Sequence, residues 1–196
     1  MSSRKDNKGY VSRAALKLKG VLEHIDIDFK GKTVMDVGSS HGGFVQVELL
    51  NGASKVYAVD VGRGILNWKL RNLEEVEVME GVNARDLRPE DFAPRPDIAV
   101  VDVSFISLKR ILPVVFNIAR REVLALVKPQ FEATYRESSK KGGVIDNPDI
   151  ENRVIEEVKE AVDNKNWEFI AAYNSPLKGK KGNREYFLYY EKTGSQ

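Results

Sequence analysis

The sequence predicts an α/β fold in which a mostly parallel sheet is covered by helices on both faces. Three observations indicate this class. Short apolar segments rich in β-branched residues recur along the 196-residue chain, helical patterns separate them, and the last two such segments follow one another without a helix between them. Strands that alternate with helices form parallel sheets. Two strands joined directly form a hairpin, so the last of seven strands should be antiparallel.

Each element is predicted from its own pattern. Apolar runs predict strands over 33–38, 55–60, 76–80, 97–102, 122–128, 168–173 and 185–191. Apolar residues at helical spacing predict a first helix with Ser12 as the N-cap, apolar positions as far as Ile25 and Gly31 as its end, and further helices over 42–50, 65–73, 108–119 and 149–164. Polar, glycine-containing loops are expected over 133–147 and 174–184.

Composition limits the classes of protein that need consideration. The length fits a single domain over 1–196, with residues 1–9 expected to be flexible. The absence of cysteine excludes a disulfide scaffold and a thiol nucleophile, and two histidines are too few for a histidine-based zinc site. No apolar run approaches the roughly 20 residues of a membrane span, and the polar first ten residues are not a signal peptide. We therefore expect a cytoplasmic protein that needs neither a membrane nor a metal.

The loop after the first strand carries the strongest local signal. Residues 36–44 read DVGSSHGGF, and such glycines let the backbone turn sharply and approach a ligand. The second strand ends in Asp60, 22 residues after Gly38, where an acid meets ribose hydroxyls in Rossmann-like folds. The GxxxGG spacing is neither a P-loop nor GxGxxG. With Asp36, it favours S-adenosylmethionine, which has a ribose and a cationic centre. An ordinary strand-to-helix turn is the alternative interpretation.

Four charged residues stand out by position: Lys17 in the first helix, Asp102 and Lys128 at strand ends, and Glu185 at the start of the last strand. Charges next to apolar runs are costly to desolvate unless they are paired. If all four meet at one sheet edge, two ammonium groups balance two carboxylates. A lysine beside a second ammonium group has a lowered pKa and can act as a general base toward a hydroxyl. Taken singly, each residue fits a surface ion pair equally well.

Positive charge gathers in two regions although the net charge is only +2. Residues 1–32 hold eight basic side chains against four acids, and residues 174–184 hold four basic side chains and no acid. Clusters of this kind bind phosphate backbones. A solvated surface is the alternative interpretation of either cluster.

Several segments resemble the FtsJ-like ribose methyltransferases, and within them the TlyA or haemolysin A branch. They are YVSRAALKL, DVGSSHGGF, VYAVDVG, NARDL, VVDVSFISL, LVKPQFE, KGGV and GNREYF, and together they extend from about Tyr10 to Tyr190. DVSFISL and VKPQFE are specific to that branch. The resemblance implies a Rossmann-like enzyme that moves a methyl group from S-adenosylmethionine to a ribose 2′-hydroxyl in ribosomal RNA, on its own or within a ribosomal subunit.

The resemblance also implies roles for particular residues. Lys128 would be the base, held by Asp102 and Glu185, while Lys17 lowers its pKa. Asp60 would take the ribose hydroxyls and Asn83 would lie near the adenine. The cofactor-binding set would be Asp36, Gly38, Ser39, Gly42, Gly43, Phe44, Asp60, Asn83 and Asp102, and the RNA-binding set Arg13, Lys140, Lys141, Lys178, Lys180, Lys181 and Arg184.

The chain departs from the family pattern in two ways. His41 stands where the family has threonine or proline, and a solvent-facing loop position is expected for it. The branch also carries an N-terminal S4-like RNA-binding domain, whereas little of this chain precedes Tyr10, so the chain is either a fragment or a member without that domain.

Two other functions stay open. One is a methyltransferase for a non-RNA acceptor, although no DPPY-type segment for amino groups is present. The other is a non-catalytic RNA-binding ribosome-assembly factor, which would predict a broken glycine loop or a missing lysine, and neither is found. A cytolysin function is suggested only by the name of the branch. We reject it, because the sequence offers no amphipathic or apolar membrane segment to support it.

Overall fold

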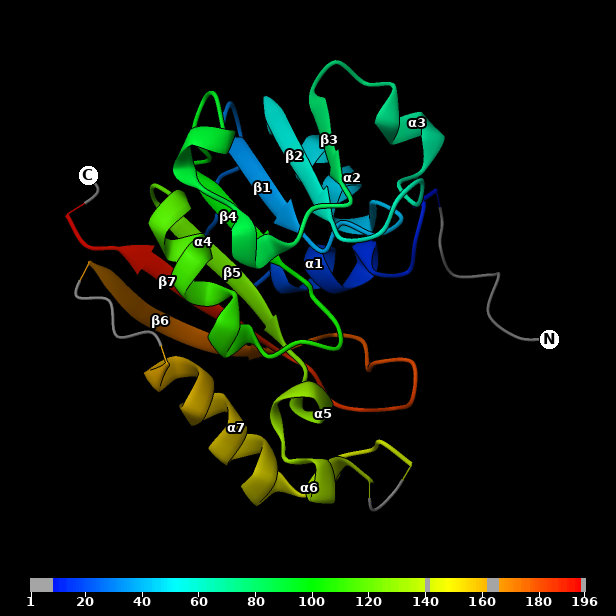
Figure 1. Ribbon diagram of the computed structural model, residues 1–196, viewed down its shortest axis with the longest axis vertical. Coiled ribbons are helices and arrows are strands. Elements are labelled where there is room, and N and C mark those ends of the chain that lie inside the picture. Colours follow the sequence, from blue (N-terminus) through cyan, green and yellow to red (C-terminus); the bar gives the residue numbers. More distant parts are fainter. Residues whose placement is uncertain (1–8, 140–141, 162–165, 195–196) are drawn as a thin grey trace.

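A seven-stranded sheet organises the molecule (Figure 1). The computed structural model describes residues 9–139, 142–161 and 166–194. The strand order is β3-β2-β1-β4-β5-β7-β6, in which β7 is antiparallel to both of its neighbours and all other pairs are parallel. The strands are β1 (Thr33–Val37), β2 (Lys55–Asp60), β3 (Val76–Glu80), β4 (Ile98–Val101), β5 (Glu122–Val127), β6 (Trp167–Asn174) and β7 (Tyr186–Lys192). The predicted fold class and the antiparallel last strand are confirmed.

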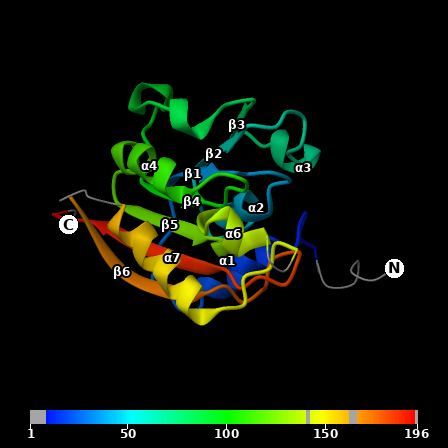
Figure 2. The ribbon, with the colours of Figure 1, turned by 60° about the horizontal axis from the view of Figure 1, so that its bottom comes forward.

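Helices cover both faces of the sheet (Figures 1 and 2). They are α1 (Ala15–Val21), α2 (Gly43–Leu50), α3 (Trp68–Arg71), α4 (Leu112–Ile118), α5 (Pro129–Glu132), α6 (Tyr135–Ser139) and α7 (Pro148–Glu160), with short 3₁₀ turns at Ala84–Asp86, Pro89–Asp91 and Leu108–Arg110. One core joins α1 and α2 to the sheet, and a second core joins α4 and α7 to its other face. No helix in the described part of the chain has the length and apolar character required to cross a membrane.

The central strand β1 is buried on both faces, as expected for a parallel sheet. Val34 belongs to the core under α1 and α2, whereas Met35 and Val37 belong to the core under α4. Side chains alternate along a strand, so Asp36 points to the α1 and α2 face. This carboxyl group is therefore placed inside the protein, beneath the loop that follows the strand.

Strand β7 lies between β5 and β6 and is antiparallel to both, and this arrangement positions Lys128 and Glu185. Val127 of β5 is in register with Tyr186 of β7. The next residue beyond this pair on β5 is Lys128, and the preceding residue on β7 is Glu185. Two charged residues that are far apart in the sequence are thus brought to the same end of neighbouring strands.

Three predicted boundaries differ from the structure at the first half of the chain. The first helix begins at Ala15 rather than Ser12, and the Ser12 hydroxyl accepts a hydrogen bond from the Ala14 amide at 3.0 Å. It ends at Val21, well before Gly31, which was expected to end it. The helix predicted over 65–73 shrinks to α3, because the amides of Ile65 and Leu66 donate to the carboxylate of Glu80 instead of entering a helix.

Two further differences lie in the second half. The loop predicted over 133–147 contains α6, whose first turn is closed by Glu137 accepting hydrogen bonds from the amide and the hydroxyl of Thr134. The last helix begins at Pro148, capped by the Asn147 side chain, and ends at Glu160. The predicted continuation over 162–164 lies outside the described residues.

Candidate active site

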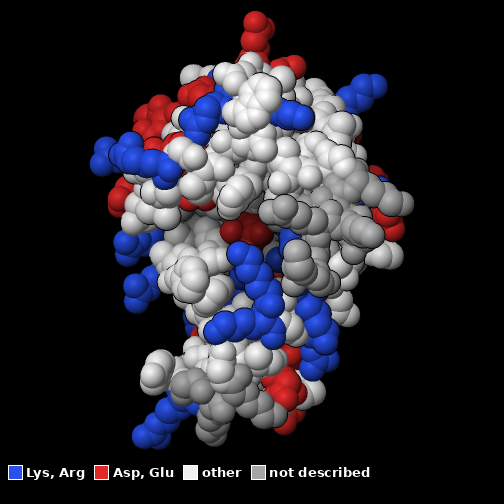
Figure 3. Space-filling view, turned by 90° about the vertical axis from the view of Figure 1, so that its right-hand side faces the viewer, with Lys and Arg blue, Asp and Glu red and all other residues white. Residues whose placement is uncertain are grey.

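Two adjoining cavities open where the parallel strands end. The larger has a volume of about 680 Å³ and is lined mainly by α1, the glycine loop and the loops around residues 128–143 and 179–185. The smaller, about 370 Å³, lies between the ends of β1, β2 and β4. The two cavities share five lining residues, Gly38, Ser40, Asp102, Ser104 and Phe105. Figure 3 shows a hollow in which carboxylate atoms lie deep while Lys and Arg side chains gather along its rim.

The glycine loop requires glycine at several positions. Gly38 has a φ of +90°, and a Cβ there would lie 2.4 Å from the backbone oxygen of Asp102. The two loops that carry these residues therefore touch backbone to backbone. A Cβ on Gly43 would lie 2.9 Å from the amide nitrogen of Ala15, so this glycine lets α1 approach the start of α2. These glycines therefore serve the packing of the loop against neighbouring backbone, and their approach to a ligand stays a prediction.

Asp60 shapes the wall of the smaller cavity. Its carboxylate accepts a hydrogen bond from the Ser40 amide at 2.9 Å and another from the Gly62 amide at 2.7 Å. Asn83 lines the same cavity, and its side-chain oxygen accepts a hydrogen bond from the Arg85 amide at 3.1 Å. The remaining lining is largely apolar and includes Val37, Val59, Val61, Ile65, Val82 and Ile111. An apolar slot with an acid and an amide at its edge suits a nucleoside.

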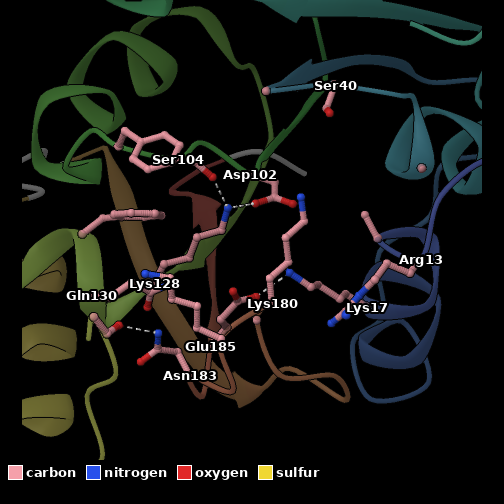
Figure 4. Close-up of a pocket in the computed structure, with 18 of the residues that line it drawn as sticks. Arg13, Lys17, Ser40, Asp102, Ser104, Lys128, Gln130, Lys180, Asn183 and Glu185 are labelled. Atoms are coloured by element: carbon pink, nitrogen blue, oxygen red, sulfur yellow. Dashed lines mark hydrogen bonds and ion pairs between the residues drawn. The ribbon is translucent and has the colours of Figure 1, made fainter. Parts of the chain in front are cut away.

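The four charged residues singled out above form two buried ion pairs (Figure 4). The ammonium nitrogen of Lys128 lies 2.6 Å from Oδ1 of Asp102 and donates to the Ser104 hydroxyl at 2.9 Å. The ammonium nitrogen of Lys17 lies 2.5 Å from Oε2 of Glu185. Lys17, Lys128 and Glu185 are each less than one-tenth exposed. All four residues line the larger cavity, so the predicted convergence at one edge is present.

The pairing differs from the expected one in one respect. The resemblance implied that Asp102 and Glu185 both hold Lys128, whereas the ion-pair partner of Glu185 is Lys17. The reason is directional, because Glu185 points toward α1, where Lys17 approaches from the opposite wall (Figure 4). Each lysine thus has one carboxylate partner.

A carboxyl pair lies beneath the site rather than in it. Asp36 on β1 and Glu48 on α2 are completely buried, and Asp36 lines neither cavity. Burial raises the pKa of Asp36 well above its usual value, Asp102 and Asp60 raise it further, and the Val45 backbone amide opposes them. Burial and the proximity of Asp36 likewise raise the pKa of Glu48.

Aromatic side chains that the sequence reasoning missed line the outer wall of the larger cavity. Phe105 is 89% exposed at a φ of +64°, and its ring centroid lies 4.9 Å from that of Phe131. Tyr135, 85% exposed, lines the same cavity. The signal available for Phe105 and Phe131 was their position shortly after strand-end residues, in VSF and KPQF. Ser104, which contacts Lys128, lies in the same VSF segment and was also missed.

The residues predicted to bind RNA divide into four groups. Arg13, Lys180 and Lys181 line the larger cavity, and Lys180 points toward Asp102 in Figure 4. Lys178 is exposed, and its carbonyl accepts a hydrogen bond from Arg13 at 2.5 Å.

Arg184 is instead tied to Glu151 by an ion pair of 2.9 Å. Lys140 and Lys141 lie outside the described residues. The described lining of the larger cavity holds five basic and two acidic side chains, an excess of positive charge suited to phosphates.

Two residues of the predicted cofactor-binding set, Asp36 and Gly42, line neither cavity, because Asp36 is buried beneath the loop and a φ in the left-handed region turns Gly42 away. Ser39, Gly43 and Phe44 line the larger cavity, and Gly42 is the N-cap residue of α2 at a φ of +88°. His41 is exposed, as expected. Among the described residues, no three His, Cys, Asp or Glu side chains gather as a metal site would require.

Fold and site together define a class: α/β proteins that bind a nucleotide-type cofactor at the carboxyl ends of a parallel sheet. The family model of the FtsJ-like methyltransferases matches residues 10–192. The chain therefore belongs to the FtsJ-like methyltransferase family.

Known relatives support this assignment. The chain is 42% identical over 184 residues to the 16S/23S rRNA (cytidine-2′-O)-methyltransferase TlyA of Mycobacterium tuberculosis, with 93% of this chain and 68% of that protein covered. It is 40% identical to the 23S rRNA (cytidine-2′-O)-methyltransferase TlyA of Campylobacter jejuni, over 94% of this chain and 72% of the relative. The crystal structure of a candidate hemolysin from Lactococcus lactis superimposes with a TM-score of 0.89 at 42% identity, covering 95% and 90% of the two chains.

Proposed function

We propose that this protein transfers a methyl group from S-adenosylmethionine to the 2′-hydroxyl of a cytidine in ribosomal RNA. The observation that carries the proposal is the buried Lys128–Asp102 pair in the wall between two cavities. One cavity has the apolar walls and the acid that suit a nucleoside cofactor, and the other has the positive charge that suits RNA. Membership of the FtsJ-like family and the names of the TlyA relatives support the reaction and the substrate.

The residues of the smaller cavity fit the cofactor. Its apolar side chains suit the adenine ring, Asp60 is placed to accept hydrogen bonds from ribose hydroxyls, and Asn83 suits the polar edge of the base. Gly38 and Asp102 line both cavities, so the rest of the molecule would pass these two residues toward the larger cavity. When bound, S-adenosylmethionine supplies an electrophilic methyl group.

The catalytic work assigned to this chain is proton removal and orientation. In its neutral form, the amine of Lys128 accepts the proton of the ribose 2′-hydroxyl, so that the oxygen becomes a better nucleophile. Asp102 and the Ser104 hydroxyl fix the direction of the amine, because each contacts the same nitrogen. Lys17, neutralised by Glu185, adds a second ammonium group to the same cavity. Positioning of this kind accounts for large rate factors without a metal.

The first experiment separates cofactor binding from turnover. Calorimetric titration with S-adenosylmethionine should give saturable binding, and titration with NAD should give none. Transfer of a radiolabelled methyl group to ribosomal RNA, with digestion to nucleosides, should yield 2′-O-methylcytidine. Absence of any labelled RNA product, with cofactor binding intact, would contradict the proposed acceptor.

Replacement of the proposed base provides the mechanistic test. Lys128→Met keeps the length of the side chain but removes the amine, so methyl transfer should fall by at least roughly 100-fold, within the range for a general base, while cofactor affinity changes little. Lys109→Met is the matched control, because Lys109 pairs with Glu157 away from the cavities. Turnover that survives in Lys128→Met would show that the base is misassigned.

A further inference from the structure

The position of Glu185, the glutamate that pairs with Lys17, is fixed by a second, buried glutamate, Glu151. Glu151 lies in the first turn of α7 and is only 2% exposed. Its carboxylate accepts hydrogen bonds from the guanidinium of Arg184 at 3.1 Å and from the Tyr186 hydroxyl at 2.8 Å, and it forms an ion pair with Arg184 at 2.9 Å. Arg184 and Tyr186 are the two neighbours of Glu185 in the sequence. A single carboxylate therefore fixes the chain on both sides of Glu185.

The direction of Glu185 explains why this matters for the cavity. Arg184 and Tyr186 both contact Glu151 of α7, whereas Glu185 between them contacts Lys17, whose nitrogen lies 2.5 Å away. Figure 4 shows Glu185 pointing toward Lys17, while Asn183 points away from it. The Tyr186 hydroxyl stays protonated as the donor, since burial and Glu151 raise its pKa to about 12.

The same segment is joined to the loop that precedes α7. Asn183 is 2% exposed, its side-chain oxygen accepts a hydrogen bond from the Ile145 amide at 2.8 Å, and its side-chain amide donates to the Gly143 carbonyl at 2.9 Å. The Gly179 amide donates to the Asn183 carbonyl at 2.9 Å. A Cβ on Gly179 would lie 2.5 Å from Oε1 of Glu185, so the loop closes directly over that carboxylate.

Anchoring of α7 does not require a charged residue at position 151. The helix already packs on the sheet through Val154, Ile155 and Val158, which are buried in one of the two cores. Burying a charged pair contributes little net stability compared with apolar packing of the same volume. A buried carboxylate that binds two specific side chains is better suited to fixing one geometry than to stabilising the fold.

We infer that Glu151 is a positioning residue for Glu185, and through Glu185 for the ammonium group of Lys17. Glu151 lines neither cavity, and it acts by fixing Arg184 and Tyr186. The inference rests on the proposed function, because its consequence is the geometry of the methyl-transfer site. It also gives Arg184 a structural role in place of the predicted contact with RNA.

Kinetics of variants provide the first test. Glu151→Ala should lower kcat by roughly 10- to 100-fold, the range expected when a reacting geometry is displaced by about 1 Å, with KM for S-adenosylmethionine unchanged. Glu151→Gln should recover part of the loss, because its amide oxygen still accepts from Tyr186. Glu156→Ala is the matched control on the same helix, since Glu156 is exposed and pairs with Lys159 at the surface.

A double variant distinguishes positioning from general loss of stability. If Glu151 acts through Glu185, adding Glu151→Ala to Glu185→Ala should not lower kcat further. Additive losses, or an unchanged kcat in Glu151→Ala, would overturn the inference.

Hydrogen exchange separates this inference from the proposed function, because it needs no substrate. In Glu151→Ala, amides over 175–186 should exchange faster while those of β5 stay protected, and unchanged protection over 175–186 would overturn the inference. A wild-type protein that binds cofactor but methylates no RNA would count against the proposed function alone.

Discussion

At the scale of single residues, the site consists of charges that a protein interior accepts only in pairs. Lys17 and Lys128 are each less than one-tenth exposed and each has one carboxylate within ion-pair distance. Removing one member of such a pair leaves an uncompensated buried charge, which costs about 3–5 kcal/mol. Loss of activity in an alanine variant at Asp102 or Glu185 should therefore be compared with the stability of that variant.

Asp60 offers a test of cofactor binding with little influence on the ion pairs. Asp60→Ala removes a carboxylate from the smaller cavity and two hydrogen bonds to backbone amides. Hydrogen bonds to charged groups contribute about 1.5–3 kcal/mol, so the Kd for S-adenosylmethionine should rise roughly 10- to 100-fold. Calorimetry measures this change. Asp28→Ala is the matched control, because Asp28 likewise accepts from a backbone amide but on an exposed turn; an affinity equal to wild type in Asp60→Ala would remove Asp60 from the cofactor site.

Because Glu48 is buried, we expect the stability of the protein to depend on pH in an unusual way. Its pKa is raised in the folded protein, so above about pH 4.5 the unfolded chain releases a proton that the folded protein retains, and stability falls as pH rises. Glu48→Met should therefore raise the free energy of unfolding at pH 7 by an amount of order 1 kcal/mol. The gain should shrink below about pH 4.5. Urea unfolding at pH 4 and pH 7 measures both; a variant less stable than wild type at pH 7 would contradict the prediction.

At the scale of elements, loops are fixed by carboxylates that bind backbone amides. Glu80 at the end of β3 accepts hydrogen bonds from the amides of Gly64, Ile65 and Leu66 at 2.6, 2.9 and 3.0 Å, and it pairs with Arg71 at 2.6 Å. The segment held in this way follows Asp60 and contributes Ile65 to the smaller cavity. Contacts with Arg71 and these amides lower the pKa of Glu80 to about 2.

Replacing Glu80 should loosen that segment in a pH-dependent manner. Because its folded pKa is lowered, its contribution to stability is fully present above about pH 4.5 and is lost as pH falls toward 2. Glu80→Gln should lower the urea midpoint at pH 7 and weaken S-adenosylmethionine binding several-fold, with a smaller stability difference at pH 3. Glu77→Gln is the control on the same strand, where the carboxylate pairs with Lys55 at the surface. Equal effects of the two variants would refute the special role of Glu80.

At the scale of the whole molecule, charge is nearly balanced overall but not at the cavity. The net charge is +2, while the described lining of the larger cavity holds five basic and two acidic side chains. Two of the basic residues are neutralised by the ion pairs, which leaves Arg13, Lys180 and Lys181 to meet phosphates. Long-range attraction of RNA should thus be concentrated at the face seen in Figure 3.

Salt dependence of RNA binding measures this concentration of charge. The logarithm of the RNA association constant should fall linearly with the logarithm of salt concentration, and Lys180→Ala with Lys181→Ala should reduce the slope by about 1 to 2. Affinity for S-adenosylmethionine should be nearly unchanged. Lys159→Ala serves as the control, since Lys159 lies on α7 and pairs with Glu156. A slope unchanged by the double variant would place the RNA elsewhere.

The order of elements and the chemistry at their ends could be predicted from the sequence, because both depend on local pattern. Alternation of apolar strands and helices predicts the sheet, and strand ends of a parallel sheet share one edge, so Asp60, Asp102 and Lys128 had to lie near one another. The fold class and the family are confirmed. The glycine loop was recognisable for the same reason, since its geometry is set within nine residues.

Pairing, in contrast, was decided only by the tertiary structure. Which lysine faces Glu185 depends on the side from which α1 and β7 approach, and Arg184 turned to Glu151 on a helix more than 30 residues earlier. The helix expected over 65–73 was shortened by the distant carboxylate of Glu80. Local sequence determines which groups reach an edge, whereas the partner of each charge is set by desolvation and distance among segments that meet only after folding.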